Sequence, residues 1–188
     1  PEKIAIIGAG LAGGAAAYAL KQRGLNAEVY EAGPEVACGA SGNPVGLFNP
    51  RPFALRHARN EYHAAGLELI ARTARNMAET YPDIDFRLPG CLHLINDKDK
   101  EIRHGKALAG MGWPKDMMRR VEPGEASAIA GVKISVPCLY SPLAGAVCPP
   151  KLVEAYLDNV RVHLNTRVER IEKQDGLWTL YGENSRKL

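Results

Sequence analysis

The chain has 188 residues and a formal net charge of +3 at pH 7, with 46% hydrophobic and 24% charged residues. These values are typical of a folded globular protein, and they exclude disordered and collagen-like chains. The length suits one sizeable core or two small lobes. The weak positive charge is compatible with an acidic partner such as RNA, but it does not require one.

The cysteines and histidines show no pattern of a metal site or a disulfide framework. The four cysteines form no C-x-x-C pair, and the five histidines form no H-E-x-x-H pattern. We therefore expect reduced thiols and no metal. No apolar run approaches the ~20 residues needed to cross a bilayer, and the chain opens on a strand pattern rather than a signal peptide. These features predict a cytoplasmic protein with no membrane segment.

The first thirty residues predict a βαβ unit. Residues 3–7 are apolar and mostly β-branched, as in a strand buried in a parallel sheet, and residues 11–23 favour a helix that ends at Gly24. A second strand pattern follows at residues 27–30. Residues 33–52 are rich in Gly, Pro, Ser and Asn, which predicts a functional loop without regular structure.

Helical periodicity and turn signals predict the elements of the remaining chain. Small and apolar residues recur with helical period from 57 to 81, and Pro82 ends this predicted helix. The further expected elements are a strand at 88–95, helical segments at 97–111 and 123–129, a helix opening at Pro149 and ending near 159, a strand at 160–164, and a hairpin of 167–171 with 177–181 around Asp175-Gly176.

This order of elements indicates the α/β class, with a Rossmann-like nucleotide-binding fold interrupted by an insertion. We expect residues 1–81 to form the first part of the nucleotide-binding domain. Residues 82–147 are then an inserted lobe, and residues 148–188 are a segment that returns to the first domain.

A glycine motif joins the first predicted strand to the first predicted helix. Gly8, Gly10 and Gly13 form G-x-G-x-x-G, which is weak evidence alone but specific between a strand and a helix. The first glycine permits a tight turn, the second lets the backbone approach a pyrophosphate, and the third lets the helix pack on the strand. The free amides and the positive end of the helix dipole favour the phosphate charge. The motif predicts a dinucleotide site.

Glu31 ends the second predicted strand, eighteen residues after Gly13. A carboxylate at this point can accept hydrogen bonds from the hydroxyls of an adenosine ribose. It also repels a 2′-phosphate, so NADP is disfavoured and the glycine motif leaves FAD or NAD as the ligand.

The segment from Cys38 to Leu47 carries a resemblance to a known family. Its Ala-Ser-Gly-Asn-x-x-Gly sequence resembles the D-amino-acid-oxidase-like (DAO) family of FAD enzymes, and within it the oxidase domains that remodel the wobble uridine of bacterial tRNA. Gly90-Cys91-Leu92 resembles that family's first strand of the substrate lobe. Residues 141–149 resemble one of its turns, with Ala146 where tryptophan is common. Residues 166–171 resemble a hairpin whose valine contacts adenine through its backbone.

The resemblance implies FAD as the cofactor and a partial substrate lobe at 82–147. Members of that family continue into further flavin-binding segments, so the chain is expected to be truncated at its C-terminus. Ser41 and Asn43 can donate hydrogen bonds to phosphate or to the flavin ring. The residues assigned to the cofactor are Gly8, Gly10, Leu11, Ala12, Gly13, Tyr30, Glu31, Ala32, Ala40, Ser41, Gly42, Asn43, Gly46, Leu47 and Val168.

The activity implied by the resemblance is oxidation of a C–N bond. The first expectation is a demodifying enzyme that acts on carboxymethylaminomethyluridine of tRNA and releases glyoxylate. An oxidase or dehydrogenase of glycine or D-amino acids is the alternative enzyme, and a non-catalytic dinucleotide-binding module is the alternative of another class. No catalytic side chain is identified. The arginines at 51, 56, 59, 119 and 120 are candidates for an acidic substrate or RNA phosphates, although a solvated face is the simpler explanation.

Overall fold

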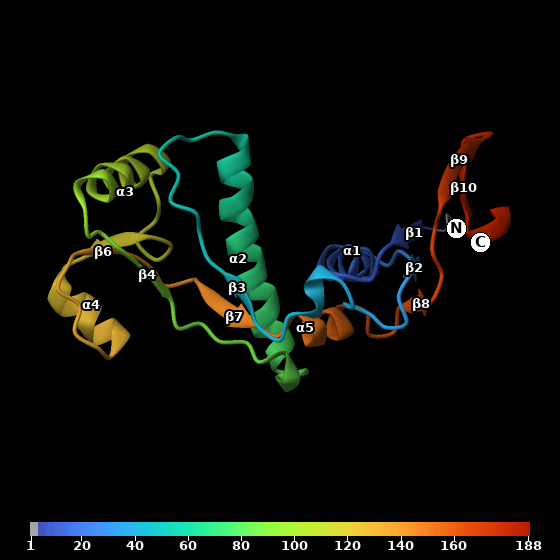
Figure 1. The fold of residues 1–188 in the computed structure, drawn as a ribbon, viewed down its shortest axis with the longest axis horizontal. Coiled ribbons are helices and arrows are strands. Elements are labelled where there is room, and N and C mark those ends of the chain that lie inside the picture. Colours follow the sequence, from blue (N-terminus) through green and yellow to red (C-terminus); the bar gives the residue numbers. More distant parts are fainter. Residues whose placement is uncertain (1–3) are drawn as a thin grey trace. The chain divides into compact units, whose positions relative to one another are not determined.

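The computed structural model describes residues 4–188, and the chain divides into two compact units. Unit 1 contains the described residues up to Gly46 together with Cys148–Leu188, and unit 2 contains Leu47–Val147. Figure 1 shows the path of the chain through both. Unit 1 is therefore discontinuous in sequence.

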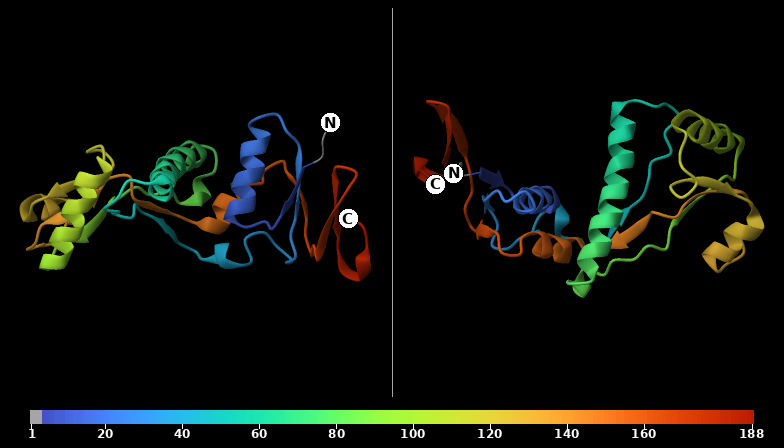
Figure 2. Two further views of the ribbon diagram at one scale, coloured as in Figure 1. Left: turned by 90° about the horizontal axis from the view of Figure 1, so that it is seen from above. Right: turned by 180° about the vertical axis from the view of Figure 1, so that it is seen from behind.

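Unit 1 is built on a three-stranded parallel sheet in the order β1-β2-β8. Each of the two chain segments that form unit 1 also contributes one α-helix. Its main elements are β1 (Ile4–Ile7), α1 (Leu11–Lys21), β2 (Ala27–Tyr30), α5 (Pro149–Tyr156) and β8 (Arg161–His163). The helices α1 and α5 lie side by side (Figure 2). Ala17, Val29 and Val153 are fully buried between these elements, so the core joins the two ends of the chain.

The other elements of unit 1 are a short 3-10 helix in its first segment, and a hairpin followed by a second short 3-10 helix near the C-terminus. These elements are η1 (Ala40–Gly42), β9 (Arg170–Gln174), β10 (Leu177–Tyr181) and η3 (Glu183–Ser185). The hairpin turn is Asp175-Gly176, and both residues have positive φ, 50° and 82°. A two-residue turn of this kind matches the twist of antiparallel strands, so the turn and the second strand agree with the prediction. The first strand, predicted at 167–171, lies instead at 170–174.

Unit 2 has a three-stranded antiparallel sheet in the order β4-β6-β5 and a separate pair of strands, β3 and β7. Its elements are β3 (Gly46–Phe48, whose first residue is in unit 1), α2 (Ala58–Ala78), η2 (Pro82–Ile84), β4 (Cys91–Leu94), α3 (Lys98–Met111), β5 (Arg119–Val121), α4 (Pro123–Ala130), β6 (Cys138–Ser141) and β7 (Gly145–Val147). Val121, Ala126 and Cys138 form a buried cluster that fixes α4 against the sheet.

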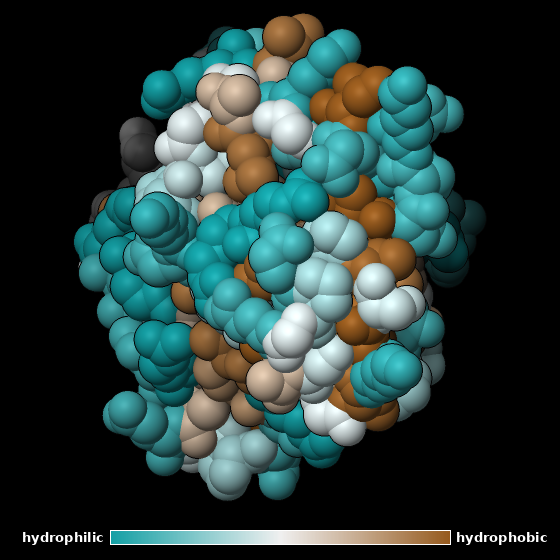
Figure 3. Space-filling model, turned by 90° about the vertical axis from the view of Figure 1, so that its left-hand side faces the viewer, coloured by the Kyte–Doolittle hydropathy of each residue, from teal (hydrophilic) through white to brown (hydrophobic). Residues whose placement is uncertain are grey.

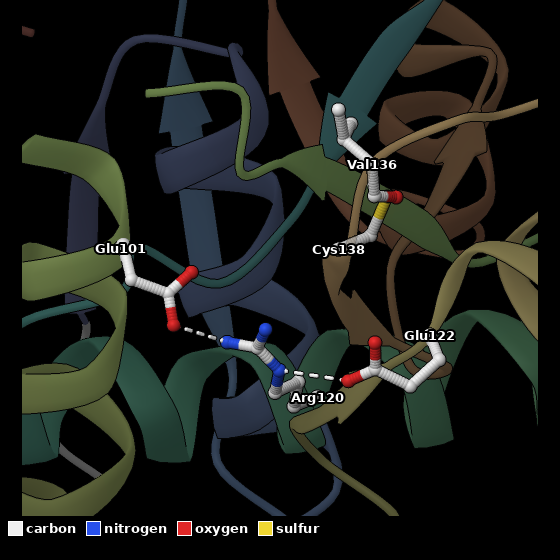
Figure 4. A network of polar contacts seen from close by, with 5 residues as sticks. All are labelled: Glu101, Arg120, Glu122, Val136 and Cys138. Carbon is white, nitrogen blue, oxygen red and sulfur yellow. Dashed lines mark hydrogen bonds and ion pairs between the residues drawn. The ribbon is translucent and has the colours of Figure 1, made fainter. Parts of the chain in front are cut away.

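A polar network on unit 2 neutralises two of the candidate arginines. Figure 4 shows Arg120 between Glu101 of α3 and Glu122 before α4, at 2.6 and 3.0 Å. Arg119 pairs with Glu125 at 2.6 Å. Exposed pairs of this kind add only about 0–1 kcal/mol to stability. The glutamates do, however, cancel the positive charge of both arginines. Arg119 and Arg120 are therefore weak candidates for binding RNA phosphates.

The face of unit 2 seen in Figure 3 is mainly hydrophilic, with separate hydrophobic patches between the polar residues. Among residues 4–188, no helix is long and apolar enough to cross a membrane. Within the same residues, no group of three or more His, Cys, Asp or Glu side chains is arranged to hold a metal ion.

The structure differs from the sequence-based expectation in where the chain passes from one unit to the other. We predicted that the first lobe extends to Tyr81, whereas residues 47–81 group with unit 2. The reason is that β3 pairs with β7, and the ring of Phe48 packs against the backbone of Gly145. Which of these residues belong to the flavin-binding domain in the functional sense stays a prediction.

Several element boundaries also differ from the sequence-based prediction, and the structure has four short strands that were not predicted. The helix predicted at 57–81 is α2, which ends at Ala78, and the strand predicted at 88–95 is shortened to β4 because Gly90 has a positive φ of 80°. The helix predicted to reach 159 is α5, which ends at Tyr156. The strands β3, β5, β6 and β7 were not predicted, and β3 lies inside the segment predicted as an irregular loop.

Candidate functional site

The loop between β1 and α1 is a tight turn held against β2. Gly8 has a φ of +94°, which residues with a Cβ rarely adopt, and its amide donates to the carbonyl oxygen of Tyr30 at 2.8 Å. A Cβ built on Gly13 would overlap the carbonyl oxygen of Gly8 and approach Ile6 Cγ2 to 3.3 Å. The first turn of α1 therefore lies directly against the end of β1, as the motif predicts.

The N-terminus of α1 has amides without an intrahelical acceptor and no acidic side chain. Gly10 is the N-cap residue and has no capping side chain, and the first turn contains no Asp or Glu. The first intrahelical bond is donated by Gly14 to the Gly10 carbonyl, at 2.8 Å. The amides of Leu11, Ala12 and Gly13 come before it and have no intrahelical acceptor. This end of the helix suits the negative charge of a pyrophosphate.

Ser41 is brought to this helix end by η1. Its Oγ accepts a hydrogen bond from the Leu11 amide at 3.0 Å, across thirty residues of sequence. A Cβ on Gly10 would lie 3.0 Å from the same Oγ, so a side chain at that position would displace Ser41. The hydroxyl can also donate, since Ser has one O–H and two lone pairs. Ser41 thus lies where it can bind a phosphate oxygen together with the helix amides.

Glu31 is the acidic group of the site, and backbone amides hold it in place. Oε2 accepts from the Ala9 amide and Oε1 from the Gly33 amide, both at 2.7 Å. Burial raises the pKa of Glu31, but these two bonds and the thiol of Cys38, 3.8 Å from Oε1, lower the pKa below its usual value. The carboxylate is therefore ionised at neutral pH, and its remaining lone pairs can accept from ribose hydroxyls.

Two of the predicted residues use their side chains for other contacts. The ring of Tyr30 stacks on His163, with centroids 4.6 Å apart, so Tyr30 contributes to the glycine loop through its carbonyl oxygen. The amide of Asn43 donates to the carbonyl of Ala40 at 3.3 Å, within its own turn. A role for the Asn43 side chain toward flavin stays a prediction.

The other predicted residues lie around the site or outside unit 1. Ala32 and Gly42 are exposed, and Val168 is half-buried between β8 and β9. Gly46 lies against Pro149, where a Cβ would come to 2.6 Å from the proline ring. Leu47 belongs to unit 2, and its side chain is 81% exposed. The structure therefore brings the glycine loop, Glu31 and Ser41 together, but it does not place Leu47 with them.

Sequence reasoning missed three residues that shape the carboxylate site. The amides of Ala9 and Gly33 orient Glu31, and the exposed thiol of Cys38 lies beside it. Ala37 has a φ of +57° and donates its amide to the Ala9 carbonyl at 2.9 Å, which returns the loop to the glycine turn. The G-x-G pattern could have indicated the Ala9 amide, but no pattern indicates the path of the loop.

Comparison with family models decides the assignment. The model of the DAO family, described as FAD dependent oxidoreductase, matches residues 3–187. The chain belongs to this family. The glycine loop, the ionised Glu31 and the free end of α1 fit the adenosine and pyrophosphate parts of the FAD that DAO proteins use. The sequence-based expectations of family, fold class and cofactor are confirmed.

Curated relatives resemble the chain along nearly its whole length. It is 33% identical to the "tRNA 5-methylaminomethyl-2-thiouridine biosynthesis bifunctional protein MnmC" of Magnetococcus marinus, over 96% of the chain and 27% of that protein. It is 34% identical to the MnmC protein of Nitrosospira multiformis, over 100% of the chain and 30% of that protein. The chain thus spans less than a third of the length of these relatives.

Solved structures show the same fold at low sequence identity. Glycine oxidase from Bacillus cereus matches with a TM-score of 0.76 and 18% identity, covering 98% of the chain and 52% of that structure. L-proline dehydrogenase from P. horikoshii matches with a TM-score of 0.76 and 17% identity, covering 98% of the chain and 50% of that structure. These matches establish the DAO fold.

Replacing Glu31 by Gln should weaken FAD binding by about 1–3 kcal/mol, the usual loss for a charge-assisted hydrogen bond. A glutamine has one carbonyl oxygen, so it cannot accept from both the Ala9 and Gly33 amides and also from the ribose. The measurement is flavin affinity of the complete protein by fluorescence titration. Glu35→Gln is the matched control, since Glu35 is exposed in the same loop. An unchanged affinity in Glu31→Gln would remove Glu31 from the site.

Proposed function

We propose that this chain forms the adenosine- and pyrophosphate-binding part of an FAD-dependent enzyme that oxidises a C–N bond on modified tRNA. The substrate group is carboxymethylaminomethyluridine at the wobble position, and the products are aminomethyluridine and glyoxylate. The observation that carries this proposal is the 33–34% identity to proteins named for tRNA 5-methylaminomethyl-2-thiouridine biosynthesis, along nearly the whole chain. A tRNA substrate also implies a cytoplasmic location.

The residues of unit 1 bind and orient the cofactor in this proposal. The amides at the start of α1 and the Ser41 hydroxyl bind the pyrophosphate, and Glu31 binds the ribose hydroxyls. The chemistry that FAD supplies when bound is acceptance of a hydride from the carbon beside an amine, after which water hydrolyses the imine. Gly46 and Leu47, which follow the Ser41 loop in sequence, are the proposed contacts to the flavin ring.

A second candidate is an oxidase or dehydrogenase of a free amino acid such as glycine. It is supported by the fold match to glycine oxidase, and "iminodiacetate oxidase" from Chelativorans is also among the similar structures, with a TM-score of 0.70. These matches have identities of 18% and 21%, so they support a fold capable of amine oxidation rather than one substrate.

Anaerobic mixing with each substrate tests the two candidates. Modified tRNA should bleach the flavin absorbance of the complete protein and release one glyoxylate per flavin reduced. If glycine or D-amino acids reduce the flavin and modified tRNA does not, the second candidate replaces the first. If no substrate reduces the bound flavin, the chain is a non-catalytic dinucleotide-binding module.

A tRNA substrate requires an electropositive surface, because phosphate contacts supply most of the sequence-independent affinity. In the described part of the chain, Arg51 and Arg59 have no ion-pair partner, whereas Arg56 pairs with Glu61 at 2.7 Å. Changing all three arginines to Gln should raise the KM for modified tRNA and leave FAD bound. The salt dependence of binding should fall by about one unit of slope for each phosphate that the variant no longer neutralises.

The matched control for these arginines is Arg119→Gln, whose charge is already compensated by Glu125. It should leave both the KM and the salt slope unchanged. Equal effects of the control and the triple variant would show that the arginines at 51, 56 and 59 do not form a specific RNA surface.

A further inference from the structure

Unit 2 has a groove between the segment that begins at β3 and the helix α2. Its volume is about 490 Å³, which lies within the usual range for small-ligand sites. Leu47, Phe48 and Asn49 line one side, and Tyr62, Leu69 and Ile70 of α2 line the other. We propose that this groove binds one unstacked nucleotide of the RNA substrate, with Tyr62 as the stacking surface. The inference rests on the proposed function.

Tyr62 is presented as a stacking surface. Its side chain is 78% exposed, and the ring of His63 lies edge-on to it with centroids 6.1 Å apart. The ring of Phe53 lies 5.8 Å from the ring of His63, centroid to centroid, so His63 contacts two other aromatic rings at this end of α2. Proteins that bind single-stranded RNA stack splayed bases on exposed aromatic rings in this way, and every base has a face that can stack.

The charge around the groove favours a polyanion. Arg51 lines the groove, and no Asp or Glu is among its lining residues. Arg59 lies three residues before Tyr62, one helical turn away on the same face of α2. Glu61 and Glu68 are seven residues apart, so they share one face of the helix, and this face is different from the one that carries Arg59 and Tyr62. The described residues place no ion-pair partner beside either arginine.

The groove also contains polar groups that a purely apolar docking surface lacks. The exposed amide of Asn49 offers both a donor and an acceptor, which matches the edge of a nucleobase. The exposed side chains of Leu47 and Leu69 supply apolar surface on either side of it. The groove thus combines a ring for stacking, an amide for the base edge and arginines for phosphate. These are the groups that proteins use to bind a nucleotide of a single-stranded loop, such as an anticodon loop.

The test measures binding of an unmodified anticodon stem-loop RNA to the flavin-loaded complete protein. Tyr62→Ala should weaken binding about 5- to 150-fold, the range for loss of one base–aromatic stack, while Tyr62→Phe should retain it. Trp178→Ala is the matched control, because this 66% exposed ring lies on β10 of unit 1 and outside the groove. Flavin absorbance per protein confirms that each variant still holds its cofactor.

The outcomes separate this inference from the proposed function. If the complete protein oxidises modified tRNA and Tyr62→Ala binds the stem-loop normally, the groove proposal is wrong and the function stands. If the unaltered protein neither binds nor oxidises tRNA, the function fails and the groove proposal fails with it. If Tyr62→Ala changes only the oligomeric state in sedimentation, the groove joins two copies of the chain, and the RNA proposal is overturned.

Discussion

Gly13→Ala should abolish stable FAD binding by the complete protein. The new Cβ would overlap the carbonyl oxygen of Gly8, which is a backbone atom, and the Cβ itself is bonded directly to the backbone of α1. Because neither can move alone, α1 must shift away from β1 and carry its amides out of place. Overpacking of this kind costs about 1–3 kcal/mol or more, so flavin affinity should fall about 5- to 150-fold or more.

Gly14→Ala is the matched control for this variant. A Cβ on Gly14 would lie 3.4 Å from the Cβ of Tyr156, an ordinary contact between α1 and α5. Alanine is also favoured over glycine inside a helix by about 1 kcal/mol. The flavin-to-protein absorbance ratio after gel filtration should therefore be low for Gly13→Ala and normal for Gly14→Ala. Normal flavin content in both variants would show that the close approach at Gly13 is not needed for binding.

Leu139→Ala should destabilise unit 2 by about 2–5 kcal/mol, the range for large-to-small changes in a core. Leu139 is fully buried in β6, the central strand of the antiparallel sheet, between His93 of β4 and Arg120 of β5. Such a loss is a large fraction of the roughly 5–15 kcal/mol that stabilises a typical domain.

The two tryptophans allow this loss to be assigned to unit 2. Trp113 lies in unit 2 and Trp178 in unit 1, so within these 188 residues a Trp178→Phe background leaves Trp113 of unit 2 as the remaining tryptophan. Urea unfolding in that background should show a lower midpoint for Leu139→Ala. Leu94→Ala, on β4 with 44% of the residue exposed, should shift it far less. Equal shifts would contradict the assignment of Leu139 to the core.

The parts of the fold that were predicted from the sequence are those with strong local signals. The apolar run before Gly8 and the stop at Gly24 predicted β1, α1 and β2, and Asp175-Gly176 predicted the hairpin. By contrast, β5 is only three residues long and contains Arg119 and Arg120, so no alternation of polar and apolar residues reveals it. It is a strand because β6 pairs with it, which is a tertiary effect.

The same distinction holds for the candidate site. The spacing from Gly13 to Glu31 predicted a carboxylate for the ribose hydroxyls, which stays a prediction, and the bond from the Ala9 amide places this carboxylate beside the glycine loop. The position of Cys38 beside Glu31 depends on the left-handed backbone of Ala37, which the sequence does not reveal. The ion pair of Arg120 with Glu101 spans nineteen residues, so local patterns could not show that its charge is compensated.

The discontinuity of unit 1 has a consequence for the order of folding during synthesis. The strand β2 can pair with β8 only after Arg161 has left the ribosome, and 133 residues separate Glu28 from its partner Arg161. At about 5–20 residues per second, β2 waits about 7–27 seconds with one edge unpaired, while all of unit 2 is made. Unit 2 can complete its contacts in this interval, and its folding shortens the loop whose closure opposes the β2–β8 pairing. The nascent chain is therefore most exposed to misassociation through β2 in the period before β8 arrives.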